Sequence, residues 1–332
     1  MLMKARVSNR FGQWQQIGSL QCLITFLSVL ALMCCILASP SFAQYGGDRP
    51  FHNQSRFLGT ETVTVALVQL PSAEVGDWDD IQLFVQEASN KGADFVVFPE
   101  SSYLGWLNPA VFEQAVPIPG DVTQQLGRIA SDFNVWIAFG TSEQGPSAGD
   151  GVYYPYDSGV IISPNGDIAL HARKHNVLEN SFTPSDCPPE VQNPGGGCNY
   201  LAAPVDNLGV VETPLGTTAI LVCADAYTYD TAALDRVKSL GAEAIIVVWG
   251  VTAGQKDQCG SDGFNATTYA QSAATYTGAL VIGANAVGNR PYGRYQPSVY
   301  CGYSGISAPD GAIIGETETD GGVFVYEVPV SN

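Results

Sequence analysis

Strand-like runs rich in β-branched residues alternate with segments of helical period along most of this chain. The runs at residues 64–70 and 93–100 flank residues 78–92, in which Ile81 and Val85 lie on one helical face. The same order of elements recurs over residues 122–143, 217–250 and 264–288. This alternation predicts an α/β fold, in which helices cover the faces of a largely parallel sheet.

Two turn signals add antiparallel strands to this plan. The turn sequence PNG joins the runs at residues 158–164 and 167–174 in a predicted hairpin, and Asp310 with Gly311 marks a second hairpin. Mixed sheets are therefore expected. No linker rich in Pro, Ser or Gly divides residues 61–330, so we predict that they form one domain.

Residues 180–207 form a long insert within the predicted domain. The segment is rich in Pro, Gly and Asn and is longer than an ordinary connection between two elements. Long loops of this kind in compact domains tend to be functional lids or rims. The sequence leaves open whether the insert covers a site or builds an interface.

The first 43 residues differ in character from the rest. They contain three basic residues and no acid, followed by a 16-residue apolar run and the small-residue sequence SFA before Gln44. The run is shorter than the roughly 20 residues that span a bilayer, so cleavage is favoured over a permanent anchor. We expect a signal peptide at residues 1–43 and a flexible leader at residues 44–60. The mature protein should be secreted or periplasmic, without stable membrane insertion.

The chain is strongly acidic, with 14 Lys and Arg against 32 Asp and Glu and a formal net charge of −18. Such a surface repels phosphate backbones, so nucleic acid is a poor candidate partner. No metal site is predicted, because no group of His, Cys and Asp has the spacing of metal ligands.

Five cysteines follow the predicted signal peptide, an odd number for an oxidising compartment. Four of them lie in Gly- and Pro-rich surroundings that are typical of loops, whereas Cys223 ends a strand-like run. We expect disulfides between Cys187 and Cys198 and between Cys259 and Cys301, with Cys223 as a free thiol. Two other pairings of the four loop cysteines are possible, and this one is preferred because Cys187 and Cys198 are close in sequence.

Three residues that can do chemistry end strand-like runs: Glu100, Lys174 and Cys223. In α/β sheets, ligands bind beyond the carboxyl ends of the strands. Each residue alone has an ordinary alternative, as a loop acid, a surface cation or a buried packing residue. Together they suit acyl transfer: a thiol nucleophile, a carboxylate that takes its proton and an ammonium that stabilises an oxyanion.

The order of these residues and their local motifs resemble the nitrilase or carbon-nitrogen hydrolase superfamily. The motifs are VVFPES at Glu100, ARKH at Lys174 and LVCAD at Cys223, and the similarity extends over residues 61–330. The resemblance implies a four-layer α-β-β-α sandwich, no metal, no organic cofactor and a homodimer or larger homo-oligomer. It also implies that Glu100 is the general base, Lys174 the oxyanion stabiliser and Cys223 the nucleophile.

Several further residues are candidates for binding the substrate. Glu179 stands where members of several branches of the family carry a second glutamate, although a surface acid is an equally good interpretation. Tyr103 and Trp106 follow Glu100 and could form a wall of the site. The backbone N–H of Ala224 could be a second oxyanion donor, and Trp249 could line the pocket or pack in the core.

The sequence ADAYTYD after the cysteine lacks both the Trp-Glu that resembles true nitrilases and the Tyr-Asp or Phe-Asp found in many amidases, and the first of these absences makes nitrile hydrolysis the weaker alternative. We therefore expect a hydrolase that cleaves a small-molecule amide and releases ammonia or an amine. Hydrolysis of nitriles and acyl transfer to another acceptor are alternatives, as is a catalytically silent binding or assembly protein. A Cys/His mechanism is weakly supported, because His171 and His175 are expected to face away from Lys174 on an extended strand.

Overall fold

The computed structural model describes residues 61–73, 75–260 and 263–330. The predicted signal peptide and leader lie outside these residues. Within the described part of the chain, no helix has the length and apolar character that a membrane crossing requires.

The first sheet has six strands in the order β15-β1-β2-β3-β4-β5. Strands β1, β2 and β3 run parallel, whereas the outer strands pair antiparallel. The predicted PNG hairpin is confirmed, because it joins β4 to β5. The bounds are β1 (Thr62–Gln69), β2 (Phe95–Val97), β3 (Trp136–Gly149), β4 (Val152–Ile162), β5 (Ile168–Arg173) and β15 (Gly322–Pro329).

The second sheet also has six strands, in the order β14-β13-β10-β8-β7-β6. Its centre is parallel and built from strongly apolar runs, because these strands are covered on both faces. The bounds are β6 (Val211–Thr213), β7 (Gly216–Val222), β8 (Ala244–Trp249), β10 (Leu280–Asn285), β13 (Gly305–Ser307) and β14 (Ile313–Glu316). A small third sheet contains β9 (Thr252–Ala253), β11 (Val287–Asn289) and β12 (Val299–Cys301).

Successive side chains of β1 enter two different cores, which shows why the sheets form layers. Val65 and Leu67 belong to the large core between the two sheets, whereas Ala66 and Val68 belong to the core beneath the helices of the first sheet. Successive side chains of a strand point to opposite faces, so a strand that is apolar at every position must be covered on both sides.

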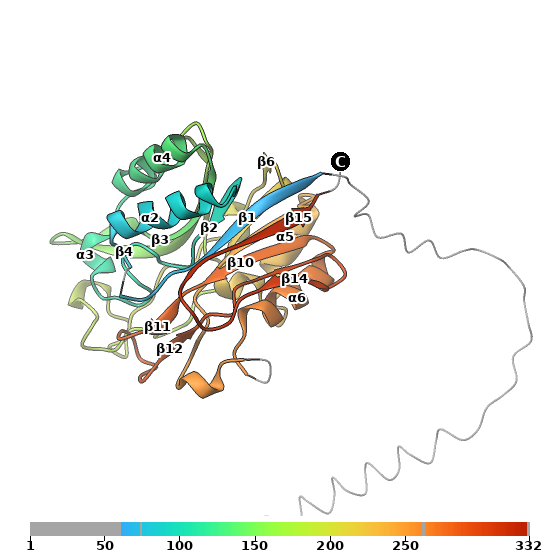
Figure 1. The fold of residues 1–332 in the computed structure, drawn as a ribbon. Coiled ribbons are helices and arrows are strands. Elements are labelled where there is room, and N and C mark those ends of the chain that lie inside the picture. The colour runs from blue at the N-terminus through green and yellow to red at the C-terminus, as the bar shows by residue number, and fades with distance from the viewer. Residues whose placement is uncertain (1–60, 74, 261–262, 331–332) are drawn as a thin grey trace, which may run out of the picture. The chain divides into compact units, whose positions relative to one another are not determined.

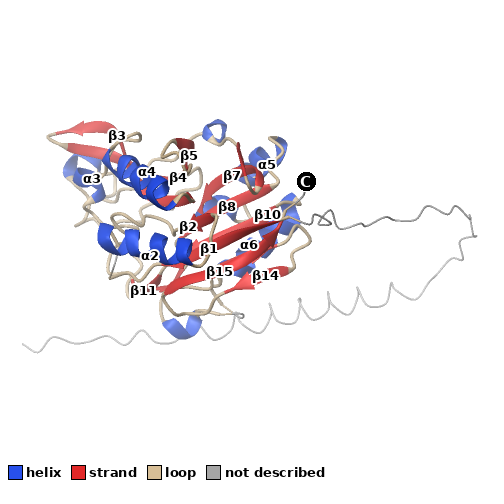
Figure 2. Cartoon of the chain, turned by 45° about the horizontal axis from the view of Figure 1, so that its top comes forward, coloured by secondary structure: helices blue, strands red, loops and turns tan. Residues whose placement is uncertain are grey.

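Helices cover the outer face of each sheet. Helices α2 (Trp78–Asn90) and α4 (Asp121–Phe133) pack on the first sheet, and α5 (Ala232–Ser239) and α6 (Ala266–Thr277) lie on the opposite side of the molecule (Figures 1 and 2). A short helix, α3 (Val111–Gln114), precedes α4. The layers follow the order helix, sheet, sheet, helix, so the predicted α-β-β-α sandwich is confirmed.

Both predicted disulfides are present in the structure. Cys187 is bonded to Cys198 within the insert, and Cys259 is bonded to Cys301 of β12. Cys223 is the free cysteine of the described residues, and it is buried. A free thiol is thus retained at the end of a central strand, where the sequence places it.

Candidate active site

The structure brings Glu100 and Lys174 into direct contact. Glu100 follows β2 and Lys174 follows β5, and Nζ of Lys174 donates a hydrogen bond to Oε1 of Glu100. Both side chains are almost fully buried. Burial alone would lower the pKa of Lys174. The negative charges of Glu100 and Asp157 outweigh burial and raise this pKa above its ordinary value. The ammonium is therefore held in its charged form.

Cys223 joins this cluster from the second sheet. It follows β7 and opens a single 3-10 turn, η3 (Cys223–Ala226), with a φ angle of 43°. A non-glycine residue in this left-handed region stores strain, and such strain recurs where a nucleophile is displayed on a sharp turn after a strand. The negative charge of Glu100 and the positive charge of Lys174 both act on the pKa of the thiol, so the three groups share one site.

The surroundings of Cys223 favour its neutral thiol form. Burial, together with the negative charge of Glu100, raises the pKa of Cys223 to about 12, although Lys174, the backbone of Gly250 and the Tyr227 hydroxyl act in the opposite direction. A nucleophile of this kind needs a base at the moment of attack.

Glu100 has the features of that base. Its Oε2 atom is buried and has no hydrogen-bond partner in the described part of the chain. Burial and the neighbouring Asp157 raise the pKa of Glu100 well above its ordinary value, which makes the carboxylate a stronger base. The unpartnered oxygen is free to exchange a proton with a thiol, a water molecule or a substrate.

Gly250 leaves the room that this carboxylate occupies. A Cβ atom at this position would lie 1.8 Å from Oε2 of Glu100, closer than two atoms can approach without a bond. The preceding residue, Trp249, accepts a hydrogen bond from the Glu100 backbone N–H at 3.1 Å. The end of β8 therefore fixes both the main chain and the side chain of Glu100.

Asp157 is a further member of the cluster that sequence reasoning missed. It lies within β4, is fully buried, and its Oδ2 atom is 3.2 Å from Nζ of Lys174. Its main-chain carbonyl accepts a hydrogen bond from the Lys174 N–H at 2.8 Å, and Ser101 donates to its Oδ1 at 3.3 Å. The sequence signal was an acid inside the apolar strand run YDSGVII, where an unpaired charge would be costly.

Asp225 ties the nucleophile turn to the lysine strand. Its buried carboxylate accepts hydrogen bonds from the backbone N–H groups of His175 at 3.0 Å, Asn176 at 2.7 Å and Val222 at 3.4 Å. Burial raises the pKa of Asp225 to about 6 in spite of these bonds. One side chain thus holds together the ends of β5 and β7, which belong to different sheets.

Trp106 lies beside Lys174. Nζ of Lys174 is 5.8 Å from the centre of the Trp106 ring, and the guanidinium of Arg290 is 4.9 Å from the same ring. Arg290 is buried and donates to Tyr295 O at 3.0 Å and Ser298 Oγ at 3.3 Å, which anchors the segment after β11.

The remaining predicted binding residues lie in different surroundings. Trp249 is fully buried and stacks on Tyr227, so its ring supports the site from the core side. Tyr103 packs against Trp78 in the core beneath α2 and α4, because its short loop turns toward that helix layer.

Glu179 is exposed and has no hydrogen bond within the described residues. The Ala224 N–H lies in the first turn of η3, where N–H groups lack partners within the turn.

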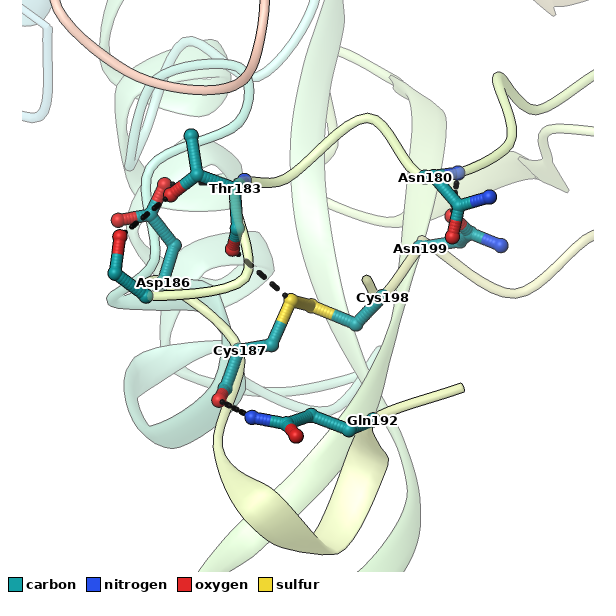
Figure 3. Close-up of a disulfide and its surroundings, with 8 residues drawn as sticks. Asn180, Thr183, Asp186, Cys187, Gln192, Cys198 and Asn199 are labelled. Atoms are coloured by element: carbon teal, nitrogen blue, oxygen red, sulfur yellow. Dashed lines mark hydrogen bonds between the residues drawn. A yellow bond between two sulfur atoms is a disulfide. The ribbon is translucent and has the colours of Figure 1, made fainter. Parts of the chain in front are cut away.

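The insert at residues 180–207 builds a wall next to Trp106. Phe182, Tyr200 and both insert cysteines share a buried cluster with Trp106. Figure 3 shows the disulfide between Cys187 and Cys198, with Gln192 donating to the Cys187 carbonyl at 2.8 Å. The end of the insert runs beside the lysine, because Ala203 donates to the Lys174 carbonyl at 2.9 Å.

The two histidines near Lys174 do not contact the thiol. His171 bonds Glu143 at 2.9 Å, and Nδ1 of His175 bonds the Ala203 carbonyl at 2.7 Å. Over residues 61–73, 75–260 and 263–330, no group of three or more His, Cys, Asp or Glu is arranged to hold a metal ion.

This fold and site define a class of enzyme that hydrolyses carbon-nitrogen bonds. Residues 64–332 match the family model described as carbon-nitrogen hydrolase, and the chain belongs to that family. The fold is similar to that of an amidase from Nesterenkonia sp., described as a member of the nitrilase superfamily. That match has a TM-score of 0.60 at 19% identity and covers 80% of this chain and 90% of the amidase.

Curated relatives carry different substrate names. The chain is 25% identical over 274 residues to a cyanide hydratase of Stereum hirsutum, which covers 73% of this chain and 68% of the relative. It is 29% identical over 151 residues to a formamidase of Helicobacter acinonychis, which covers 41% of this chain and 44% of the relative. One relative is named for a nitrile-type substrate and the other for an amide.

Proposed function

We propose that this protein is an exported amide hydrolase that works through a thioester on Cys223. The observation that carries the proposal is the contact between Lys174 and Glu100 beside a buried, strained and free cysteine. Glu100 acts as the general base, Lys174 stabilises the oxyanion and Cys223 is the nucleophile. The Ala224 N–H serves as the second oxyanion donor.

The first half-reaction forms the thioester. Oε2 of Glu100 takes the thiol proton of Cys223 as the sulfur attacks the amide carbonyl, which avoids a free thiolate in a buried site. The tetrahedral oxyanion then lies against the Lys174 ammonium. The protonated Glu100 passes its proton to the leaving nitrogen, the carbon-nitrogen bond breaks, and ammonia or an amine departs.

The second half-reaction releases the acid. Glu100, now a carboxylate again, takes a proton from a water molecule that attacks the thioester carbonyl. The second oxyanion collapses, the carbon-sulfur bond breaks and the thiolate recovers the proton held by Glu100. The carboxylic acid leaves, and each group returns to its starting protonation state.

Two observations favour an amide over a nitrile as the substrate. The sequence after the nucleophile, ADAYTYD, lacks the Trp-Glu that resembles true nitrilases, which makes a nitrile the weaker candidate, although it also lacks the Tyr-Asp or Phe-Asp of many amidases. Solved structures with a similar fold include those of an amidase from Nesterenkonia sp., and one of these contains the acetamide moiety of fluoroacetamide attached to its active-site cysteine. A nitrile is the second candidate substrate, which the cyanide hydratase relative supports.

Export is part of the same proposal. Its support is the signal-like sequence of residues 1–43 together with the two disulfides, which persist in oxidising compartments. Assembly into a homodimer or larger homo-oligomer is proposed from the family resemblance.

The test measures ammonia release from acetamide, propionamide and the matching nitriles, with intact-mass analysis of the protein during turnover. We expect amide hydrolysis and an acyl adduct on Cys223, both absent from Cys223→Ala. Glu100→Gln should lose at least about 100-fold in kcat, since a general base contributes about 10²- to 10⁴-fold. Glu113→Gln makes the same change at an exposed carboxylate and should retain full activity. Turnover that survives Cys223→Ala would refute the thioester route.

A further inference from the structure

A phenol hydroxyl lies beside the sulfur of the nucleophile. The Tyr227 hydroxyl oxygen is 3.8 Å from Sγ of Cys223, within hydrogen-bonding distance for a sulfur atom. Tyr227 directly follows η3, so the single turn that displays the cysteine also places this hydroxyl next to it. The acyl-transfer steps of Glu100, Lys174 and the Ala224 N–H make no use of it.

Packing on two sides holds the ring of Tyr227. It is stacked on Trp249, with ring centroids 6.0 Å apart and planes at 21°, and it is tilted against Tyr269 of α6 at 4.7 Å. Trp249 is fully buried, and the Tyr227 N–H donates to the Ala224 carbonyl at 3.2 Å. The hydroxyl is thus preorganised beside the sulfur before any substrate binds.

The Tyr227 hydroxyl is suited to donate a hydrogen bond and not to act as a base. Burial, and after it negative charge at Cys223 and the hydrogen bond between the two side chains, raise the pKa of Tyr227 far above its ordinary value. The phenol therefore keeps its proton during the reaction. Its O–H group can donate a hydrogen bond to a negatively charged sulfur, and this bond acts to lower the pKa of Cys223.

Two different atoms carry negative charge during acyl transfer. The carbonyl oxygen becomes an oxyanion, which lies against Lys174. The sulfur gains negative charge as Glu100 removes its proton, and again when the carbon-sulfur bond of the intermediate breaks and the sulfur takes the bonding electron pair. Lys174 already pairs with Glu100 and Asp157, so a separate donor at the sulfur would complement it.

We propose that Tyr227 is a catalytic residue, whose hydroxyl donates a hydrogen bond to the Cys223 sulfur and stabilises the negative charge of that sulfur during amide hydrolysis. The inference rests on the proposed function and adds a residue to it. The Tyr227 proton stays on its own oxygen throughout. The proton that the sulfur loses and recovers is still the one that Glu100 carries.

The experiment isolates this hydrogen bond by removing the general base. In Glu100→Gln the thiol has to ionise without help before it reacts, so the pH dependence of its alkylation by iodoacetamide reports the pKa of Cys223. This pKa should be lower than in the wild type, because the negative charge of Glu100 is gone. The other groups that influence the charge of the sulfur remain: Lys174, the Gly250 backbone, Tyr227, Tyr229 and Tyr269.

Adding Tyr227→Phe to Glu100→Gln should shift the midpoint of alkylation upward by about one pH unit, because a hydrogen bond to a charged group changes an equilibrium about tenfold. The Phe ring can keep both ring contacts, so the melting temperature should stay close to that of Glu100→Gln. Tyr269→Phe is the matched control: it removes a hydroxyl from a ring that touches Tyr227 and should leave the midpoint unchanged. An unchanged midpoint in Tyr227→Phe would overturn the inference, as would an equal shift in Tyr269→Phe.

Steady-state hydrolysis separates this inference from the proposed function. With Glu100 present, Tyr227→Phe should lower kcat/KM for acetamide about tenfold, and Tyr269→Phe should not change it. If the wild-type protein hydrolyses no amide or nitrile while the alkylation midpoint still shifts, the donor role of Tyr227 stands and the hydrolase assignment fails. If the wild-type protein hydrolyses amides and Tyr227→Phe changes neither the midpoint nor kcat/KM, the hydrolase stands and Tyr227 is a packing residue.

Discussion

The carboxylate of Asp157 lies 3.2 Å from the ammonium of Lys174, so two buried carboxyl groups share one buried cation. Burial, and after it the negative charge of Asp157, raise the pKa of Glu100 well above its ordinary value, whereas the Lys174 ammonium acts in the opposite direction. Asp157 is a positioning residue, since it acts through Lys174 and Glu100.

Asp157→Asn should move the pH dependence of the reaction. Removing the negative charge of Asp157 lowers the pKa of Glu100, because that charge helps to raise it. The base then ionises at lower pH, so the acid limb of the kcat/KM profile should shift downward, with about a tenfold loss in kcat from a less well-held lysine. If Asp157 had only a structural role, the substitution would lower kcat/KM at every pH and would not shift the acid limb of the profile. Asp132→Asn, at an exposed site, should do neither.

Gly250→Ala should nearly abolish activity in a folded protein. The new methyl group would overlap Oε2 of Glu100 and push the carboxylate away from its position. A displacement of about 1 Å can cost about 100-fold in rate, so we expect at least that loss in kcat, with a melting temperature close to that of the wild type. Gly195→Ala is the matched control, because a Cβ there meets no atom within 4 Å. Full activity in Gly250→Ala would show that Glu100 tolerates displacement.

Glu143 should make the fold sensitive to acid. Burial alone would raise the pKa of the Glu143 carboxyl group. Hydrogen bonds from Arg173, His171 and Ser158 outweigh burial and lower this pKa to about 2. A lowered pKa stabilises the fold above the ordinary carboxyl pKa of about 4.5, and this stabilisation is lost as the pH falls toward 2.

Denaturant unfolding of Glu143→Gln as a function of pH would check this. At pH 7 we expect a loss of about 3 kcal/mol in the free energy of unfolding. The difference from the wild type should shrink between pH 4.5 and about 2. Glu113→Gln, at an exposed carboxylate, should follow the wild type at every pH. A difference that stays constant with pH would mean that the charge of Glu143 is not the source of its effect.

The disulfide between Cys187 and Cys198 should stabilise the wall beside Trp106. Removing it with Cys187→Ser and Cys198→Ser frees a loop with a sequence separation of 11 residues, which costs about 3 kcal/mol in chain-entropy terms. We expect a lower melting temperature and a KM raised more than kcat is lowered, since Trp106 shares a cluster with both cysteines. A melting temperature equal to that of the wild type would show that the insert is held by packing alone.

Sequence periodicity predicted the sandwich and its main elements, because strands covered on both faces and amphipathic helices have strong local signatures. The apolar runs predicted as strands include those that form β1, β7, β8 and β10 in the structure, and the segment predicted as a helix at residues 78–92 forms α2. Boundaries were less accurate: β2 ends at Val97, before the predicted end of its run at Glu100, because the chain must turn there to place the carboxylate.

The candidate site was predictable only in part, since strand ends can be located from sequence but lateral contacts cannot. The positions of Glu100, Lys174 and Cys223 followed from their place after apolar runs. Asp157 was missed because the predicted strand run began at residue 158, whereas β4 begins at Val152 and so includes Asp157. Tyr103 was expected at the site, but the direction of its ring depends on the loop conformation after Glu100, which places it against Trp78.

The three central residues come from two different sheets: Glu100 and Lys174 follow strands of the first, whereas Cys223 follows a strand of the second. A folding intermediate in which each sheet has formed but the two have not yet docked contains no thiol beside a base. Recovery of turnover during refolding should therefore lag behind recovery of secondary structure. Turnover would then report the step in which the two sheets dock and bury the core between them.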